Sequence, residues 1–214
     1  MSHDDFDGFV SQLDNSLVVV TTAADDQLAG CVVGFHTQCS IEPRRYAVWI
    51  SKANLTYRVS LFATHFAVHL LAESDRSLLQ LFGGTSGDRT EKFALCEWAP
   101  GPGGVPLLGS CPTRAVLEIT SRWDDGSDHA CFVGNPILAE WTTATPMRVS
   151  QSGQTEAGHE AGDRAAPQNL STTEQTARHP DPADASTRRE LENTAAGAGH
   201  AIDLPPQEHD NTER

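Results

Sequence analysis

The chain has 214 residues, enough for one domain of ordinary size, and a formal net charge of −14. This acidity excludes proteins that bind nucleic acids through clustered Lys and Arg, and the lack of an apolar run of about 18 residues excludes a membrane-spanning helix. The acidic start, residues 1–5, lacks the apolar segment of a secretory signal, so we expect a cytoplasmic protein with reduced thiols.

The first part of the chain predicts one helix followed by three strands. Phe6, Phe9, Val10 and Leu13 recur at helical spacing and indicate a short amphipathic helix. Apolar, β-branched runs then indicate strands, the first two of which are joined by a turn at 24–27. The expected strands span residues 17–22, 29–37 and 46–51.

The later part predicts two more helices, a fourth strand and a hairpin. Asn54 is the expected N-cap of a helix over 56–63, and Ser74 is expected to cap a second helix with an apolar face. Turn residues at 124–127 join two apolar runs into a hairpin. The apolar helix face contains Leu78, Leu79, Leu81 and Phe82, and the strands span 66–71, 113–123 and 128–138. Roughly six or seven short strands with two or three helices indicate a mainly β fold, a β-barrel with helical insertions.

The composition of the chain changes near residue 150. All aromatic residues precede this point, and the segment that follows has no Val and only four large aliphatic residues. Burying each of these would contribute roughly 1.5–3 kcal/mol, whereas ordering the backbone costs about 1–2 kcal/mol per residue. The entropy cost is severalfold larger. We therefore predict a folded domain over 1–149 and an acidic, low-complexity, disordered tail over 150–214.

The most informative stretch lies at residues 30–43. Its apolar beginning gives way to a polar series from Gly34 to Ser40, and Glu42 and Pro43 close it. A strand that ends in this way presents N–H groups and hydroxyls where a flat, anionic ligand could lie. Lys52 follows the next strand and precedes an expected helix N-terminus, which suits a phosphate. An amphipathic edge strand and a solvated lysine are the structural alternative.

Other site signatures are absent from the chain. No Gly-rich turn follows the Rossmann or P-loop pattern, and there is no GxSxG elbow. The Cys and His residues lack paired ligand spacing, so no metal site is predicted. Cys39 is interpreted as a small strand residue rather than a nucleophile. His129, which follows Asp128 at the start of a strand, could be held at the rim of a pocket.

Five segments together carry a family resemblance. They lie at 30–43, 52–56, 66–71, 91–93 and 127–134. Their matching residues are Gly30, Gly34, Phe35, Thr37, Ser40, Glu42, Pro43, Lys52, Asn54, Thr56, Phe66, Ala67, Val68, Leu71, Lys92, Phe93, Asp128, His129 and Gly134. In this order the segments resemble the flavin reductase-like family, the FMN-binding split barrels, over about residues 6–140.

The chain departs from the family pattern at a few positions. Val32 stands where the pattern has Thr, Gly34 where it has Ser, and Arg44 where it has Pro. Side-chain hydroxyls are therefore fewer than in the family, and Arg44 or Arg45 could supply a compensating charge near the phosphate.

The resemblance implies a homodimeric split barrel that binds FMN and transfers hydride to it from NADH or NADPH, with FAD or riboflavin as further flavin substrates. It also implies transfer of reduced flavin to a monooxygenase component. His129 is then the catalytic residue that orients the nicotinamide. The implied cofactor-binding residues are Gly34, Phe35, His36, Thr37, Gln38, Cys39, Ser40, Ser51, Lys52, Asn54, Thr56, Lys92 and Phe93.

Two alternatives stay open at this point. The chain could be a non-enzymatic FMN-binding module that carries electrons or senses, or a related split barrel that uses a deazaflavin or haem. The choice between NADH and NADPH is also open, since no site for a 2′-phosphate can be identified.

Overall fold

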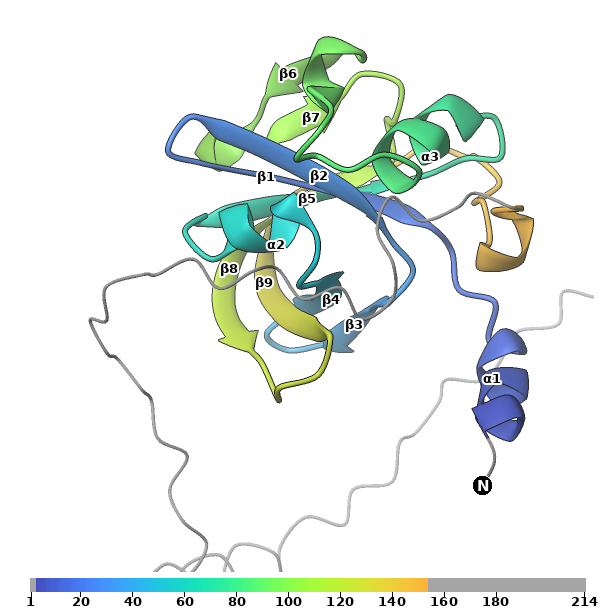
Figure 1. The fold of residues 1–214 in the computed structure, drawn as a ribbon. Helices are drawn as coiled ribbons and strands as arrows, with labels where there is room; N and C mark the ends of the chain where they lie inside the picture. The colour runs from blue at the N-terminus through green and yellow to red at the C-terminus, as the bar shows by residue number, and fades with distance from the viewer. Residues whose placement is uncertain (1–2, 154–214) are drawn as a thin grey trace, which may run out of the picture. The chain divides into compact units, whose positions relative to one another are not determined.

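Seven strands form one antiparallel sheet in the order β2-β1-β5-β8-β9-β4-β3, which curls into a half-barrel (Figure 1). The computed structural model describes residues 3–153, so from residue 154 onward the predicted tail lies outside the described residues. The strands of this sheet are β1 (Val18–Ala24), β2 (Gln27–Val33), β3 (His36–Ser40), β4 (Arg45–Ser51), β5 (His65–Leu70), β8 (Arg114–Trp123) and β9 (His129–Glu140). The predicted mainly β barrel with helical insertions is confirmed.

The remaining elements are short. The helices are α1 (His3–Ser11), α2 (Leu55–Ser60) and α3 (Arg76–Gly83), with 3-10 turns η1 (Lys92–Ala94), η2 (Pro102–Gly104) and η3 (Val149–Gln151). A second sheet pairs β6 (Trp98–Pro100) with β7 (Pro106–Leu108). The sequence does not predict β6 and β7, because each has three residues and contains a proline. Among residues 3–153, no helix is both long and apolar enough to cross a membrane.

The predicted turn at 24–27 and the predicted hairpin around 124–127 are both present. β1 and β2 are joined by Asp25 and Asp26, whose φ angles of 48° and 62° form a tight two-residue turn. Short polar side chains tolerate this left-handed conformation, and such turns follow the twist of the strands. β8 and β9 flank residues 124–128 and pair along most of their length.

The predicted strand at 29–37 is wrong, because it is two strands. β2 pairs with β1 at one edge of the sheet, and β3 pairs with β4 at the other edge. A single straight strand cannot reach both edges, so the chain bends at Gly34 and Phe35. The Phe35 carbonyl accepts the N–H of Trp49 over 2.9 Å, which attaches the bend to β4.

The helix caps differ from the prediction. Asn54 stands at the N-cap of α2, but its side chain makes no capping hydrogen bond. The N-cap of α3 is Asp75, so the prediction of Ser74 is wrong. The Asp75 carboxylate turns back to accept the Ala72 N–H at 2.9 Å, and Ser74 donates to that same carboxylate.

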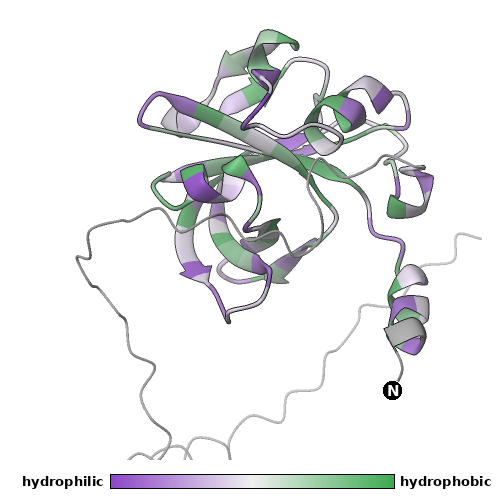
Figure 2. Ribbon diagram, viewed as in Figure 1, coloured by the Kyte–Doolittle hydropathy of each residue, from purple (hydrophilic) through white to green (hydrophobic). Residues whose placement is uncertain are grey.

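The central strands are largely green in Figure 2, and their hydrophobic side chains belong to two separate clusters. Alternate residues of β1 belong to different clusters: Val18 and Val20 pack inside the half-barrel, whereas Val19 packs outside. The inner cluster includes Ile50, Phe66, Leu117 and Phe132, and the outer cluster includes Leu71, Leu78, Leu79, Phe82, Leu108 and Met147.

The predicted N-terminal helix is present as α1, but its apolar side chains are not part of the core. Phe6, Phe9, Val10 and Leu13 are 51%, 61%, 36% and 56% exposed. The spacing therefore predicts the helix correctly without revealing what its apolar face contacts.

Candidate functional site

Two rings lie against each other where β3 and β9 begin. The centroids of Phe35 and His129 are 5.3 Å apart in an edge-on arrangement, and Phe35 is 55% exposed. His129 is the first residue of β9 and pairs with Ser51 at the end of β4. The fold thus brings the polar stretch after β2 next to the predicted catalytic histidine.

The imidazole of His129 is held by its neighbour Asp128, whose Oδ1 lies 2.9 Å from Nδ1. Because a carboxylate only accepts, Nδ1 carries a proton, and in the tautomer with a single proton Nε2 can accept a hydrogen bond. The hydrogen bond from His129 lowers the pKa of Asp128, which keeps the carboxylate charged. His129 is therefore oriented by the protein itself.

Lys52 follows β4 and is bonded to the β8–β9 hairpin, which also carries Asp128 and His129. Its N–H donates to the Asp128 carbonyl over 2.9 Å, and its Nζ lies 2.6 Å from Oδ1 of Asp124. Asp124 also accepts the Gly126 N–H at 2.8 Å. The hydrogen bond from Lys52, which has the largest effect, and the one from the Gly126 N–H lower the pKa of Asp124. We call the group formed by Phe35, Ser51, Lys52, Asp128 and His129 the ring site.

A polar cavity of about 560 Å³ lies beyond the turn that follows β4. The Asn54 N–H donates to the Ser51 carbonyl over 3.0 Å, so this turn leads from the ring site to the cavity. The predicted residues Asn54, Thr56, Lys92 and Phe93 all line it. Its acidic lining residues are Asp25, Asp26 and Glu91.

Lys92 is only 5% exposed, and its ammonium group is bound within the protein. Nζ donates to the carbonyls of Gly30 at 3.2 Å and Phe82 at 3.1 Å, and it lies 5.5 Å from the centre of the Phe82 ring. Burial lowers the pKa of Lys92. Phe93 packs edge-on against Phe82 and Trp98, with centroids 5.6 and 5.9 Å apart. Both residues therefore hold the cavity wall together.

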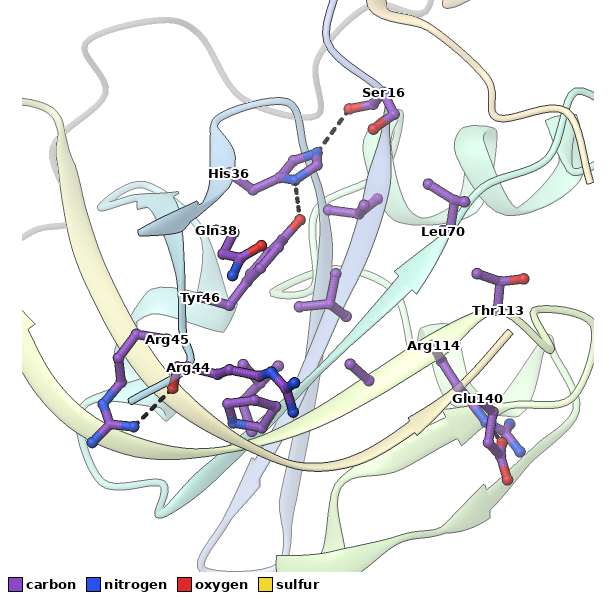
Figure 3. A pocket seen from close by; sticks show the side chains of 15 residues that line it. Ser16, His36, Gln38, Arg44, Arg45, Tyr46, Leu70, Thr113, Arg114 and Glu140 are labelled. Atoms are coloured by element: carbon purple, nitrogen blue, oxygen red, sulfur yellow. Dashed lines mark hydrogen bonds and ion pairs between the residues drawn. The ribbon is translucent and has the colours of Figure 1, made fainter. Parts of the chain in front are cut away.

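His36 and Gln38 line a different space, an inner cavity of about 410 Å³ inside the half-barrel (Figure 3). Nε2 of His36 lies 2.8 Å from the Ser16 carbonyl, and Nδ1 lies 2.6 Å from the Tyr46 hydroxyl. Since the carbonyl only accepts, Nε2 carries the proton and Nδ1 accepts from Tyr46. The structure does not bring His36 and Gln38 into the ring site. Arg44 also lines this inner cavity.

The other predicted residues are spread along β3 and α2. Gly34 forms the bend before β3, Thr37 and Cys39 are exposed, and Ser40 ends the strand half-buried. Thr56 is buried in α2. Side chains alternate along a strand, so Thr37 points away from the inner cavity that His36 lines; Cys39 lies at a register shift of β3 and does not line this cavity either.

Sequence reasoning missed two residues of these sites. It interprets Asp124 only as part of a turn, although a carboxylate in that turn is the partner of Lys52. It also treats Tyr46 only as a strand residue, whereas its hydroxyl fixes His36. The acidic hairpin tip opposite a predicted cation is a signal that could have identified Asp124.

The residues present fit a flavin. The exposed Phe35 ring and the half-buried His129 ring suit a flat aromatic group, and the polar cavity suits a hydroxyl-rich chain. Carboxylates outnumber cations in that cavity; Lys52, which pairs with Asp124 and does not line the cavity, is the cation that suits a phosphate. Within residues 3–153, His, Cys, Asp and Glu side chains form no group that could hold a metal ion.

A family model described as "Flavin reductase like domain" matches residues 10–146. High molecular weight rubredoxin of Moorella thermoacetica is 32% identical over 55% of this chain and 52% of the relative. The reductase component of the flavin-dependent trigonelline monooxygenase of Acinetobacter baylyi is 31% identical over 55% of this chain and 37% of the relative. The chain thus spans about half, or less, of the length of these curated relatives.

Solved structures share the fold. The NADH:FAD oxidoreductase of Streptomyces globisporus superposes with a TM-score of 0.62 at 20% identity, over 71% of this chain and 92% of the other. The FMN-binding protein of Thermus thermophilus gives a TM-score of 0.59 at 22% identity, over 72% and 90%. At this level of identity the likeness establishes the split-barrel architecture.

Proposed function

Because the chain belongs to the flavin reductase-like family, we propose that it is an NAD(P)H-dependent flavin reductase that uses FMN, with FAD and riboflavin as further substrates. The ring site is the observation that carries this proposal. It combines the exposed Phe35 ring and the half-buried His129 ring with the cation of Lys52, whose N–H and Nζ both contact the β8–β9 hairpin.

Each group has a proposed task. Phe35 offers a flat apolar surface, and Lys52 with Asn54 and Thr56 holds the phosphate. Asp128 keeps Nε2 of His129 as an acceptor for the amide of the nicotinamide. The backbone from Gly34 to Ser40 contacts the ring and ribityl chain, and Lys92 with Phe93 supports the cavity wall from within. A bound flavin supplies the hydride-accepting chemistry.

The test is spectroscopic. The visible spectrum of the purified protein is recorded first, and NADH or NADPH oxidation is then followed with FMN, FAD and riboflavin. A flavin reductase accelerates oxidation above the free-flavin background. A protein that retains FMN but does not accelerate oxidation would instead be an electron carrier or sensor. A protein that neither binds flavin nor accelerates the oxidation would contradict both proposals.

His129→Ala is expected to raise the KM for the nicotinamide about tenfold while changing flavin affinity much less. The reason is that one oriented hydrogen bond, worth roughly 1–1.5 kcal/mol, is lost on the nicotinamide side. Steady-state kinetics and flavin titration measure the two effects. Asp125→Asn is the matched control, because Asp125 lies in the same hairpin tip and accepts the Ser127 N–H at 3.0 Å. An equal loss of both affinities would mean that His129 is structural.

We also propose a partner monooxygenase, a homodimeric state and a cytoplasmic location. The partner is supported by relatives named as reductase components of a trigonelline monooxygenase and of a 4-nitrophenol monooxygenase. The five cysteines are free, in agreement with a reducing compartment. We keep 1–149 as the proposed domain; Ser150 and Gln151, just beyond it, bond to Asp14 and Glu73.

A further inference from the structure

The apolar face of α1 contacts no core cluster, although it carries large side chains. Phe6, Phe9 and Leu13 are each more than half exposed, and the two Phe rings lie 6.4 Å apart as one apolar surface. A continuous apolar patch of this kind on a small domain usually marks an interaction site. The catalytic proposal above uses none of these residues.

The base of α1 is held in place by the chain segment that includes η3. Asp14 accepts the Ser150 N–H at 2.9 Å and its hydroxyl at 2.8 Å, and the Asn15 carbonyl accepts the Val149 N–H at 2.9 Å. Residues 12 and 13 lie between α1 and these hydrogen bonds, and their own N–H groups donate to carbonyls in the last turn of α1. These hydrogen bonds attach the C-terminal end of α1 to the segment that includes η3.

The inner cavity has the size and lining to receive such a face. Its volume is about 410 Å³, and its apolar walls come from Val18, Val68, Leu70, Ala115, Leu117 and Pro136. A space of roughly 150 Å³ lined by apolar side chains holds one benzene-sized ring. The inner cavity can therefore hold two aromatic side chains.

The rim of the inner cavity and the α1 segment also carry opposite charges. The rim of the inner cavity carries Arg44, Arg45 and Arg114 against the single acid Glu140 (Figure 3). Arg114 is paired with Glu140, and Arg45 donates to Asn135. Within residues 3–153 no hydrogen bond or ion pair is recorded for the Arg44 guanidinium. The α1 segment is acidic, with Asp residues at positions 4, 5 and 7.

We propose that α1 of one copy docks in the inner cavity of a second copy, with Phe6 and Phe9 inserted and Asp7 near Arg44. The contact is reciprocal, because a twofold axis gives both copies the same two surfaces and closes the assembly. This inference concerns assembly and does not depend on the flavin chemistry.

The first test is self-association of the full chain, measured by sedimentation velocity over a range of concentrations. Phe9→Asp is expected to weaken the dimer roughly 30-fold or more, because a carboxylate replaces a buried ring. Phe62→Asp is the matched control, since Phe62 is also 61% exposed but lies on neither surface. Circular dichroism should show that both variants keep the barrel, because neither side chain belongs to the core.

The second test exchanges charges. Asp7→Arg and Arg44→Asp are each expected to weaken the dimer, and the double variant is expected to recover most of the loss. A mixture of Phe9→Asp with Arg44→Asp protein should form mixed dimers, because one helix and one cavity stay intact. The inference is overturned by a monomeric wild type, by equal effects of Phe9→Asp and Phe62→Asp, or by no recovery in the double variant.

Discussion

Lowering the pH from 7 to 5 is expected to reduce the stability of the barrel by roughly 2 kcal/mol through one buried side chain, His69. Its ring is 0% exposed and links two parts of the fold. Nε2 accepts the Leu108 N–H at 3.2 Å, so Nδ1 carries the proton and donates to the Val19 carbonyl at 3.2 Å. The neutral ring therefore joins β1 to β7.

The direction of this change in stability follows from the pKa of His69. Burial is the main cause that lowers this pKa from 6.5 to about 4. Between these two values the unfolded chain binds a proton that the folded chain does not bind. The stabilisation is fully present above pH 6.5 and is lost as the pH falls towards 4. One pH unit corresponds to about 1.4 kcal/mol, so the loss reaches roughly 3 kcal/mol by pH 4.

Urea unfolding at pH 7, 6 and 5 measures this effect. His69→Asn is the comparison, because it removes the titrating group. Its free energy of unfolding should change little over the same range. Carboxylates such as Asp14 and Asp124 have lowered pKa values and change the stability mainly below pH 4. Measurements between pH 7 and 5 therefore report on His69 rather than on these carboxylates. An unchanged pH slope in the variant would contradict the assignment to His69.

Gly134→Ala is expected to destabilise the fold by roughly 3 kcal/mol, at the upper end for overpacking a core. Gly134 lies in β9 between Tyr46 of β4 and Ile119 of β8. A Cβ there would stand 2.7 Å from Cβ of Leu117 and 2.9 Å from the Phe66 ring. Leu117 and Phe66 are each 1% exposed, and packed interiors offer little room for either to move.

The control for this variant is Gly34→Ala. A Cβ at Gly34 would lie 3.4 Å from Val149 and 3.8 Å from Leu17, which is ordinary contact. Thermal and urea unfolding should place Gly34→Ala close to the wild type and Gly134→Ala far below it. If the two variants lose equal stability, close packing against Leu117 is not what requires glycine in β9.

Local patterns predict the parts of the fold that depend on neighbours in the chain. Asp25 and Asp26 predict the β1–β2 turn, and the turn at 124–127 predicts the β8–β9 hairpin, because both signals lie within a few residues. The split of residues 29–37 into β2 and β3 is not predictable in this way. It depends on which strand pairs at each edge of the sheet, a long-range property.

The candidate site shows the same division. Phe35, Lys52 and His129 are identified by residue type and order, and the fold brings them together at adjoining strand ends. His36 and Gln38 belong to the same sequence motif, yet they line the inner cavity. A strand alternates its side chains between two faces, and only the pairing of β3 with β4 decides which face is inside.

The sequence by itself therefore determined the family, the mainly β class and the chemical types available for a flavin, because these depend on residue identity and order. Only the tertiary structure decided that Lys92 is bound to two carbonyls, that Asp124 pairs with Lys52, and that the face of α1 is exposed. Burial and partners arise from residues distant in the chain, and no local pattern encodes them.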